Sequence, residues 1–155
     1  MKRSIFIVLV WFLGACTEHS RTIERNALSG LNDDLRAIEK GCINALTDVN
    51  ENRFETIDSL FLLSKDTIWI ELKSGYSKSE NRLINLINLI DEQDVQLFQL
   101  QEAVNKGEIG RDDFQVFFNK EKNNLQLLNQ QVDDELSFRR DLKTMKLKLK
   151  KKYQL

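Results

Sequence analysis

Hydrophobic residues along this 155-residue chain recur mainly at alternating steps of three and four positions. The pattern is clearest after residue 22, where it runs through Leu28, Leu31, Leu35, Ile38, Cys42, Ala45 and Val49. Such a repeat is typical of a helix that packs against other helices in coiled-coil fashion. Gly30 and Gly41 interrupt helix propensity here, and we expect them where a neighbouring helix approaches closely.

The pattern after this first segment is less regular. Residues 48–53 (DVNENR) are polar, and they form either a turn or a surface stretch of one continuous helix. Helical spacing then continues through Phe54, Ile57, Phe61, Ile68 and Leu72, with Ser64 at the empty position. Residues 67–72 are rich in β-branched and aromatic side chains, which also suit a strand. We favour a helix because no second strand lies nearby to pair with it.

A first turn is predicted at residues 74–77. Gly75 can adopt a left-handed conformation after a helix end, and Ser77 and Glu80 have the spacing of a capping box. The next helix would carry Leu83, Leu86, Ile87, Ile90, Leu97, Leu100 and Val104, with Gln93 and Asp94 interrupting the stripe.

A second turn is predicted at residues 106–111, which contain Gly107 and Gly110. Asp112 or Asp113 would cap the final helix, which we expect to extend from residue 112 to 152. Its apolar positions are Phe114, Phe117, Phe118, Leu125, Leu128, Val132, Leu136, Leu142, Met145 and Leu149. Apolar and basic residues alternate in 145–149, which weakens the helical pattern there.

These elements predict an all-α fold. Helices joined by short turns run antiparallel, so we expect an up-and-down antiparallel bundle of three to four long helices with coiled-coil-like packing. The composition agrees, since the chain has no proline and only six glycines. A β-rich domain of this length would use both residues at its turns and edges. The net charge of −1 also argues against a dedicated nucleic-acid-binding protein.

The N-terminus has the pattern of an export signal. Lys2 and Arg3 precede nine apolar residues at 5–13, a run too short to span a membrane but suited to a signal peptide. The following residues, Leu13-Gly14-Ala15-Cys16, resemble the lipobox of bacterial lipoprotein precursors. Ordinary signal-peptidase cleavage and an uncleaved membrane helix remain alternatives.

The resemblance implies that Leu13, Gly14 and Ala15 are recognised by the signal peptidase, and that Cys16 carries the lipid. The domain organisation would then be a cleaved signal at 1–15, a polar tether at 16–22 and a single helical domain at 23–155. Two or more acyl chains anchor a protein stably to a membrane. Thr17 follows the cysteine where inner-membrane lipoproteins of enteric bacteria usually carry aspartate, which implies the outer membrane if the source is Gram-negative.

Charge is distributed unevenly along the mature chain. Residues 16–138 hold 13 basic and 23 acidic residues, whereas 139–152 holds eight basic residues and one acidic residue, Asp141. We define the basic segment as the cations Arg139, Arg140, Lys143, Lys146, Lys148, Lys150, Lys151 and Lys152. It is a candidate surface for binding phospholipid headgroups, lipopolysaccharide phosphates or an acidic partner. The alternative is a solvated helix end whose cations offset the helix dipole.

Catalytic patterns are scarce. His19 is the one histidine of the sequence and lies in the tether, which argues against a histidine-based metal site or a catalytic triad. Adjacent carboxylates occur at 33–34, 91–94, 112–113 and 133–135, but neighbouring residues of a helix point in different directions. Cys42 is expected to be a small buried hydrophobic residue, with an intermolecular disulfide as the alternative. Trp69 and Tyr76 are expected in the core or at its rim, although they could instead form a binding patch.

The sequence therefore predicts a membrane-anchored envelope lipoprotein that is not an enzyme, needs no cofactor and acts as a structural or protein-interaction module. Its partners would be the membrane, through the N-terminal lipid, and an envelope protein or a second copy of the chain, but not nucleic acid. The alternative is an envelope carrier of a small ligand or metal, or a helical hydrolase that uses acidic residues.

Overall fold

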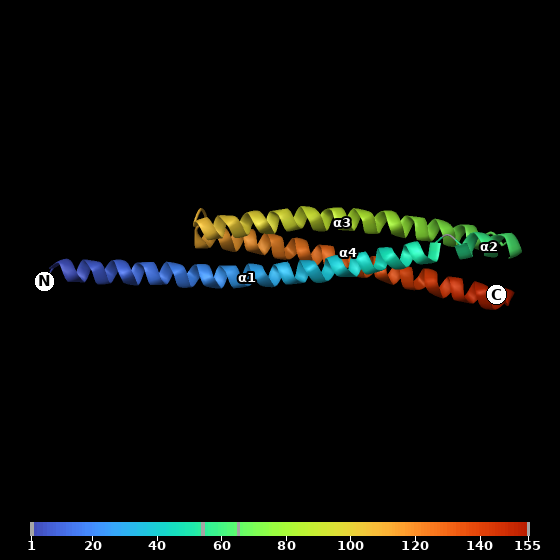
Figure 1. The fold of residues 1–155 in the computed structure, drawn as a ribbon, viewed down its shortest axis with the longest axis horizontal. Coiled ribbons are helices and arrows are strands. Elements are labelled where there is room, and N and C mark those ends of the chain that lie inside the picture. The colour runs from blue at the N-terminus through green and yellow to red at the C-terminus, as the bar shows by residue number, and fades with distance from the viewer. Residues whose placement is uncertain (1, 54, 65, 155) are drawn as a thin grey trace. The chain divides into compact units, whose positions relative to one another are not determined.

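A computed structural model describes the backbone of residues 2–53, 55–64 and 66–154, and the side chains of 21–49, 57–58, 60–62 and 66–154. Its elements are α1 (Lys2–Arg53), α2 (Glu55–Ser64), α3 (Ile68–Lys106) and α4 (Arg111–Tyr153). Successive long helices reverse direction from α1 to α3 and from α3 to α4 (Figure 1). The predicted all-α bundle is confirmed, and the described residues contain no strand.

The chain forms two compact units, each built from segments of the three long helices. One unit contains Met1–Leu35 and Gln93–Leu125. Its core is an apolar set from α1, α3 and α4: Leu28, Leu31, Leu35, Leu97, Leu100, Val104, Phe114 and Leu125. A polar pair lies beside this core, because the Gln93 amide donates a hydrogen bond to the buried Glu121 carboxylate.

The predicted turn between α3 and α4 is confirmed. Gly107 has φ of +69°, a left-handed conformation that glycine adopts without steric cost. Its amide bonds to the Val104 carbonyl at 3.1 Å, and the Glu108 amide bonds to the Ala103 carbonyl at 2.9 Å. These two bonds are those of a Schellman motif. The α3 helix therefore ends at Lys106 because Gly107 allows the backbone to reverse there.

The cap of α4 lies two or three residues before the predicted one. The Phe114 amide bonds to the Gly110 carbonyl at 2.9 Å, so Gly110 occupies the cap position. Asp112 and Asp113 instead lie exposed in the first turn of the helix. There their negative charges favour the positive end of the helix dipole.

The other unit contains Arg36–Glu92 and Gln126–Leu155. Residues from all four helices line its core: Ile38, Cys42, Ala45, Val49, Ile57, Leu60, Trp69, Leu72, Tyr76, Leu83, Leu86, Ile90, Leu128, Val132, Leu142 and Leu149. The predicted stripe of the first helix is thus buried in full across the two units. Phe54 and Ser64, also assigned to a stripe, lie outside the described side chains.

The predicted turn at 74–77 is wrong. The α3 helix passes through these residues without a break, so Ser77 and Glu80 form no capping box. The α3 helix begins instead at Ile68, where Asp66 accepts a hydrogen bond from the Ile68 amide at 3.0 Å. Residues 67–72 are therefore helical from Ile68 onward, and α1 continues to Arg53 through the polar stretch that begins at Asp48.

Gly75 has a packing role rather than a turn role. A Cβ atom at this position would lie 2.6 Å from the Leu142 Cδ2 atom, so the missing side chain lets α4 approach α3 closely. Gly30 and Gly41, which we expected at such contacts, have no neighbouring atom within 4 Å of the place that a Cβ atom would take. That expectation is wrong, because both glycines lie beside the buried stripe rather than on it.

Two apolar positions of α4 also differ from the expectation. Phe117 and Met145 are exposed, while Glu121, Glu135, Arg139 and Lys146 are buried in this helix. The basic and acidic side chains have long apolar stems that can fill space at the stripe while their charges find partners. The buried surface of α4 is therefore more polar than its apolar spacing indicates.

Substitutions at Gly41 and Gly75 test whether each glycine faces a neighbouring helix. We expect Gly41→Ala to raise the free energy of unfolding by about 1 kcal/mol, because alanine favours a helix and meets no neighbour here. Gly75→Leu should lower it by about 1–3 kcal/mol, because Leu142 must move. Urea unfolding of the full chain, followed by circular dichroism, measures both. Equal stability of Gly75→Leu and the wild type would contradict the close helix contact.

Candidate functional site

The basic segment occupies the last four turns of α4, and the structure divides it into three groups. Arg139, Lys143 and Lys152 form ion pairs with carboxylates of other helices or loops. Lys146 is buried. The remaining cations are exposed or half-buried and have no ion pair among the described residues: Arg140, Lys148, Lys150 and Lys151. The sequence therefore overstates how many of these charges are available to a ligand.

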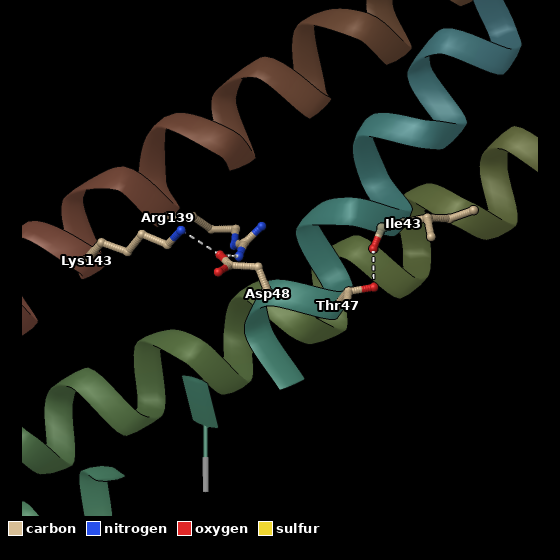
Figure 2. A network of polar contacts seen from close by, with 5 residues as sticks. All are labelled: Ile43, Thr47, Asp48, Arg139 and Lys143. Atoms are coloured by element: carbon tan, nitrogen blue, oxygen red, sulfur yellow. Dashed lines mark hydrogen bonds and ion pairs between the residues drawn. The ribbon is translucent and has the colours of Figure 1, made fainter. Parts of the chain in front are cut away.

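Asp48 of α1 is the centre of the main polar network (Figure 2). Its Oδ2 atom accepts a hydrogen bond from the Arg139 guanidinium and forms an ion pair with the Lys143 ammonium, which lies 2.8 Å away. Arg139 is 5% exposed, so this carboxylate is needed to offset the cost of burying the guanidinium charge. The Arg139 Nε atom is also buried and has no hydrogen-bond partner among the described residues.

A surface hollow lies beside this network. It is lined by Asp48, Asp133, Leu136, Arg139, Arg140 and Lys143, all of the same unit. The α4 residues reach the hollow together because positions three and four apart share one helix face. The lining thus combines three cations with two carboxylates around one apolar side chain.

Burial and charge shift the pKa of two neighbouring groups. The pKa of Lys146 is lowered, first by burial and then by repulsion from Lys150. The pKa of Tyr76 is raised, first by burial of its hydroxyl and then by the negative charge of Asp48. The Tyr76 hydroxyl has no hydrogen-bond partner among the described residues. Positive charge is therefore crowded on this part of α4, and one carboxylate offsets it from α1.

Asp66 binds the C-terminal end of the basic segment through hydrogen bonds. Its Oδ2 atom accepts hydrogen bonds from the Tyr153 hydroxyl and from the Lys152 ammonium, the latter at 3.1 Å. Together with the Ile68 amide, these donors lower the pKa of Asp66 to about 2, with Tyr153 as the largest cause. The same carboxylate thus caps α3 and fixes the C-terminal turn of α4.

The acidic cluster at 133–135 is only partly a solvated face. Glu135 is buried, and its Oε2 atom is paired with Arg82 at 3.3 Å. The Arg82 guanidinium also lies over the Phe138 ring, 5.0 Å from its centre. No group of three or more histidine, cysteine or carboxylate side chains is arranged to hold a metal within the described part of the chain.

The other residues singled out by sequence are core residues. Trp69 and Tyr76 are fully buried, as is Cys42, whose thiol has its pKa raised to about 11 by burial. Sequence reasoning missed Asp48 and Asp66 as partners of the basic segment. An aspartate before a run of helical spacing is a capping signal, which could have identified Asp66, but no local pattern identifies Asp48.

The residues of the predicted N-terminal signal, Leu13, Gly14, Ala15 and Cys16, lie outside the described side chains. Their backbone, like that of the expected tether, belongs to α1. Within the residues whose side chains are described, no helix is long and apolar enough to cross a membrane. Comparisons of the chain with protein-family models, curated proteins and solved structures give no match.

Removal of Asp48 should destabilise the fold. We expect Asp48→Asn to lower the free energy of unfolding by about 2 kcal/mol, because it leaves the buried Arg139 charge without its partner. Arg139→Met should cost less, since the buried charge itself is replaced by an apolar side chain. Asp133→Asn, an exposed aspartate of the same hollow, is the control and should change stability by less than about 0.5 kcal/mol. Urea unfolding measures all three.

The Asp66 contacts predict a stability loss in acid. The folded pKa of about 2 is below the ordinary value of 3.8, so ionised Asp66 stabilises the fold above pH 3.8. This contribution disappears as the pH falls through about 2. The difference in melting temperature between the wild type and Asp66→Asn should therefore shrink across this range.

Tyr153→Phe provides a second test of the same contacts. It removes the largest cause of the low Asp66 pKa, so the loss of stability should begin at a higher pH than in the wild type. Thermal unfolding between neutral pH and about pH 2 measures both effects. A difference between the wild type and Asp66→Asn that stays constant with pH would contradict a stabilising ionised Asp66.

Proposed function

We propose that this chain is a lipid-anchored protein of the bacterial cell envelope, in which the helical bundle acts as a structural or protein-interaction module rather than as an enzyme. The observation that carries the proposal is the sequence Leu13-Gly14-Ala15-Cys16 after a basic and then apolar N-terminus. A thiol at that position supplies the sulfur for thioether attachment of a lipid. Thr17 favours the outer membrane of a Gram-negative cell.

The surface of the bundle supports the interaction role. Several large apolar side chains are exposed in the unit that contains the α3–α4 turn: Val95, Phe98, Val116 and Phe117. Val95 and Phe98 are three positions apart, so they share one face of α3. Apolar and aromatic side chains of this kind supply contact area to a protein partner, which would be another envelope protein or a second copy of the chain.

Replacement of the two cysteines tests the anchor. We expect Cys16→Ala to abolish incorporation of labelled palmitate and to shift the protein out of the membrane fraction, because the acylated thiol is lost. Cys42→Ala is the matched control, and it should keep both the label and the membrane location because the Cys42 thiol is buried. Metabolic labelling and cell fractionation, followed by separation of inner and outer membranes on a density gradient, measure these outcomes. Retention of palmitate in Cys16→Ala would overturn the proposal.

A further inference from the structure

The hollow beside Asp48 brings together more cationic side chains than a solvated helix end requires. Its lining brings Arg139, Arg140 and Lys143 together on one face of α4, with the apolar Leu136 beside them. We propose that this hollow binds a phosphate-type oxyanion, which Arg140 and Lys143 contact directly while Arg139 supplies positive charge from behind. The site lies within one compact unit and does not depend on the lipid anchor.

The balance of charge favours an anion here. A single Asp48 oxygen, Oδ2, forms ion pairs with both Arg139 and Lys143, so one carboxylate is shared between these two cations. Arg140 is exposed and has no ion pair among the described residues. Burial and then Lys150 lower the pKa of Lys146 the most, Asp48 opposes them, and repulsion from Lys143 adds a smaller lowering effect. An added anion would relieve this crowding of positive charge.

The donor groups match the chemistry of a phosphate. Guanidinium groups present several N–H donors in a plane and bind phosphate oxygens in pairs. Arg140 has its guanidinium at the surface, and the Lys143 side chain is half exposed. Arg139 also lines the hollow, but it is buried and its guanidinium is held by Asp48. The hollow thus has two accessible cations and one fixed cation.

The remaining cations of the basic segment do not form this arrangement. Lys148, Lys150 and Lys151 do not line the hollow. Each ammonium there is a separate, strongly hydrated charge on a flexible stem. They would attract an anion without fixing its position, which makes them the matched control for the proposed site.

The test uses the full chain in uncharged detergent micelles and follows the arginine Nε–H signals by nuclear magnetic resonance. Inorganic phosphate is the first probe, and phosphatidylglycerol added to the micelles is the second. Sodium chloride at matched ionic strength controls for screening. If the ligand is a free anion, inorganic phosphate should shift the Arg139 and Arg140 signals. If the ligand is a lipid headgroup, phosphatidylglycerol should shift them. Saturable shifts with either probe support the site and identify its source.

Paired variants separate the hollow from general charge. Arg140→Gln with Lys143→Gln should weaken binding at least about tenfold, because charge-assisted hydrogen bonds to the anion are lost. Lys150→Gln with Lys151→Gln removes the same charge outside the hollow and should weaken it by less than about twofold. Asp133→Asn should strengthen binding about two- to fivefold, because it removes a competing carboxylate.

Equal weakening by the two double variants would overturn the proposal, since the charge of the whole segment would then account for binding. The absence of saturable shifts with both probes would overturn it as well. Because the readout is the arginine signals of the folded chain, the result is independent of acylation at Cys16. Failure of the anion site and failure of the lipid anchor are therefore distinguishable.

Discussion

The fold depends on burial of the apolar side chains that α1, α3 and α4 present at steps of three and four. Individual helical propensity is not enough, because most helices in water are stabilised by packing of one face rather than by their backbone alone. The stripe of α1 is buried through Leu28, Leu35, Cys42 and Val49, each with almost no exposed surface. Gly75 contributes because it has no Cβ atom, which lets Leu142 pack closely against α3.

Polar groups at buried positions add a second constraint. Gln93 bonds to Glu121, Arg82 to Glu135, and Arg139 to Asp48. A buried charge without its partner is costly, so each pair is satisfied only when the helix segments of its own unit meet in the observed register. The apolar stripe brings the helices together, and the polar pairs select how they align along their length.

The basic segment shows how folding divides a run of like charges. Asp48 forms ion pairs with Arg139 and Lys143, and Asp66 forms one with Lys152. These contacts stabilise the C-terminal half of α4, while Arg140 and the other exposed cations remain available at the surface. Of the eight cations that the sequence places in this segment, some are therefore paired or buried within the bundle and the others lie at its surface.

The amino-acid sequence was sufficient to predict the all-α class, the buried stripe of the first helix and the turn at Gly107, because each depends on local spacing or on one glycine. It misplaced the start of α3, because the same residue types at 74–80 suit both a turn and a close helix contact. The contact of Gly75 with Leu142 and the pairing of Asp48 with Arg139, 91 positions away in the chain, arise only when the helices pack together. Contacts between distant residues depend on helix register, which local periodicity does not encode.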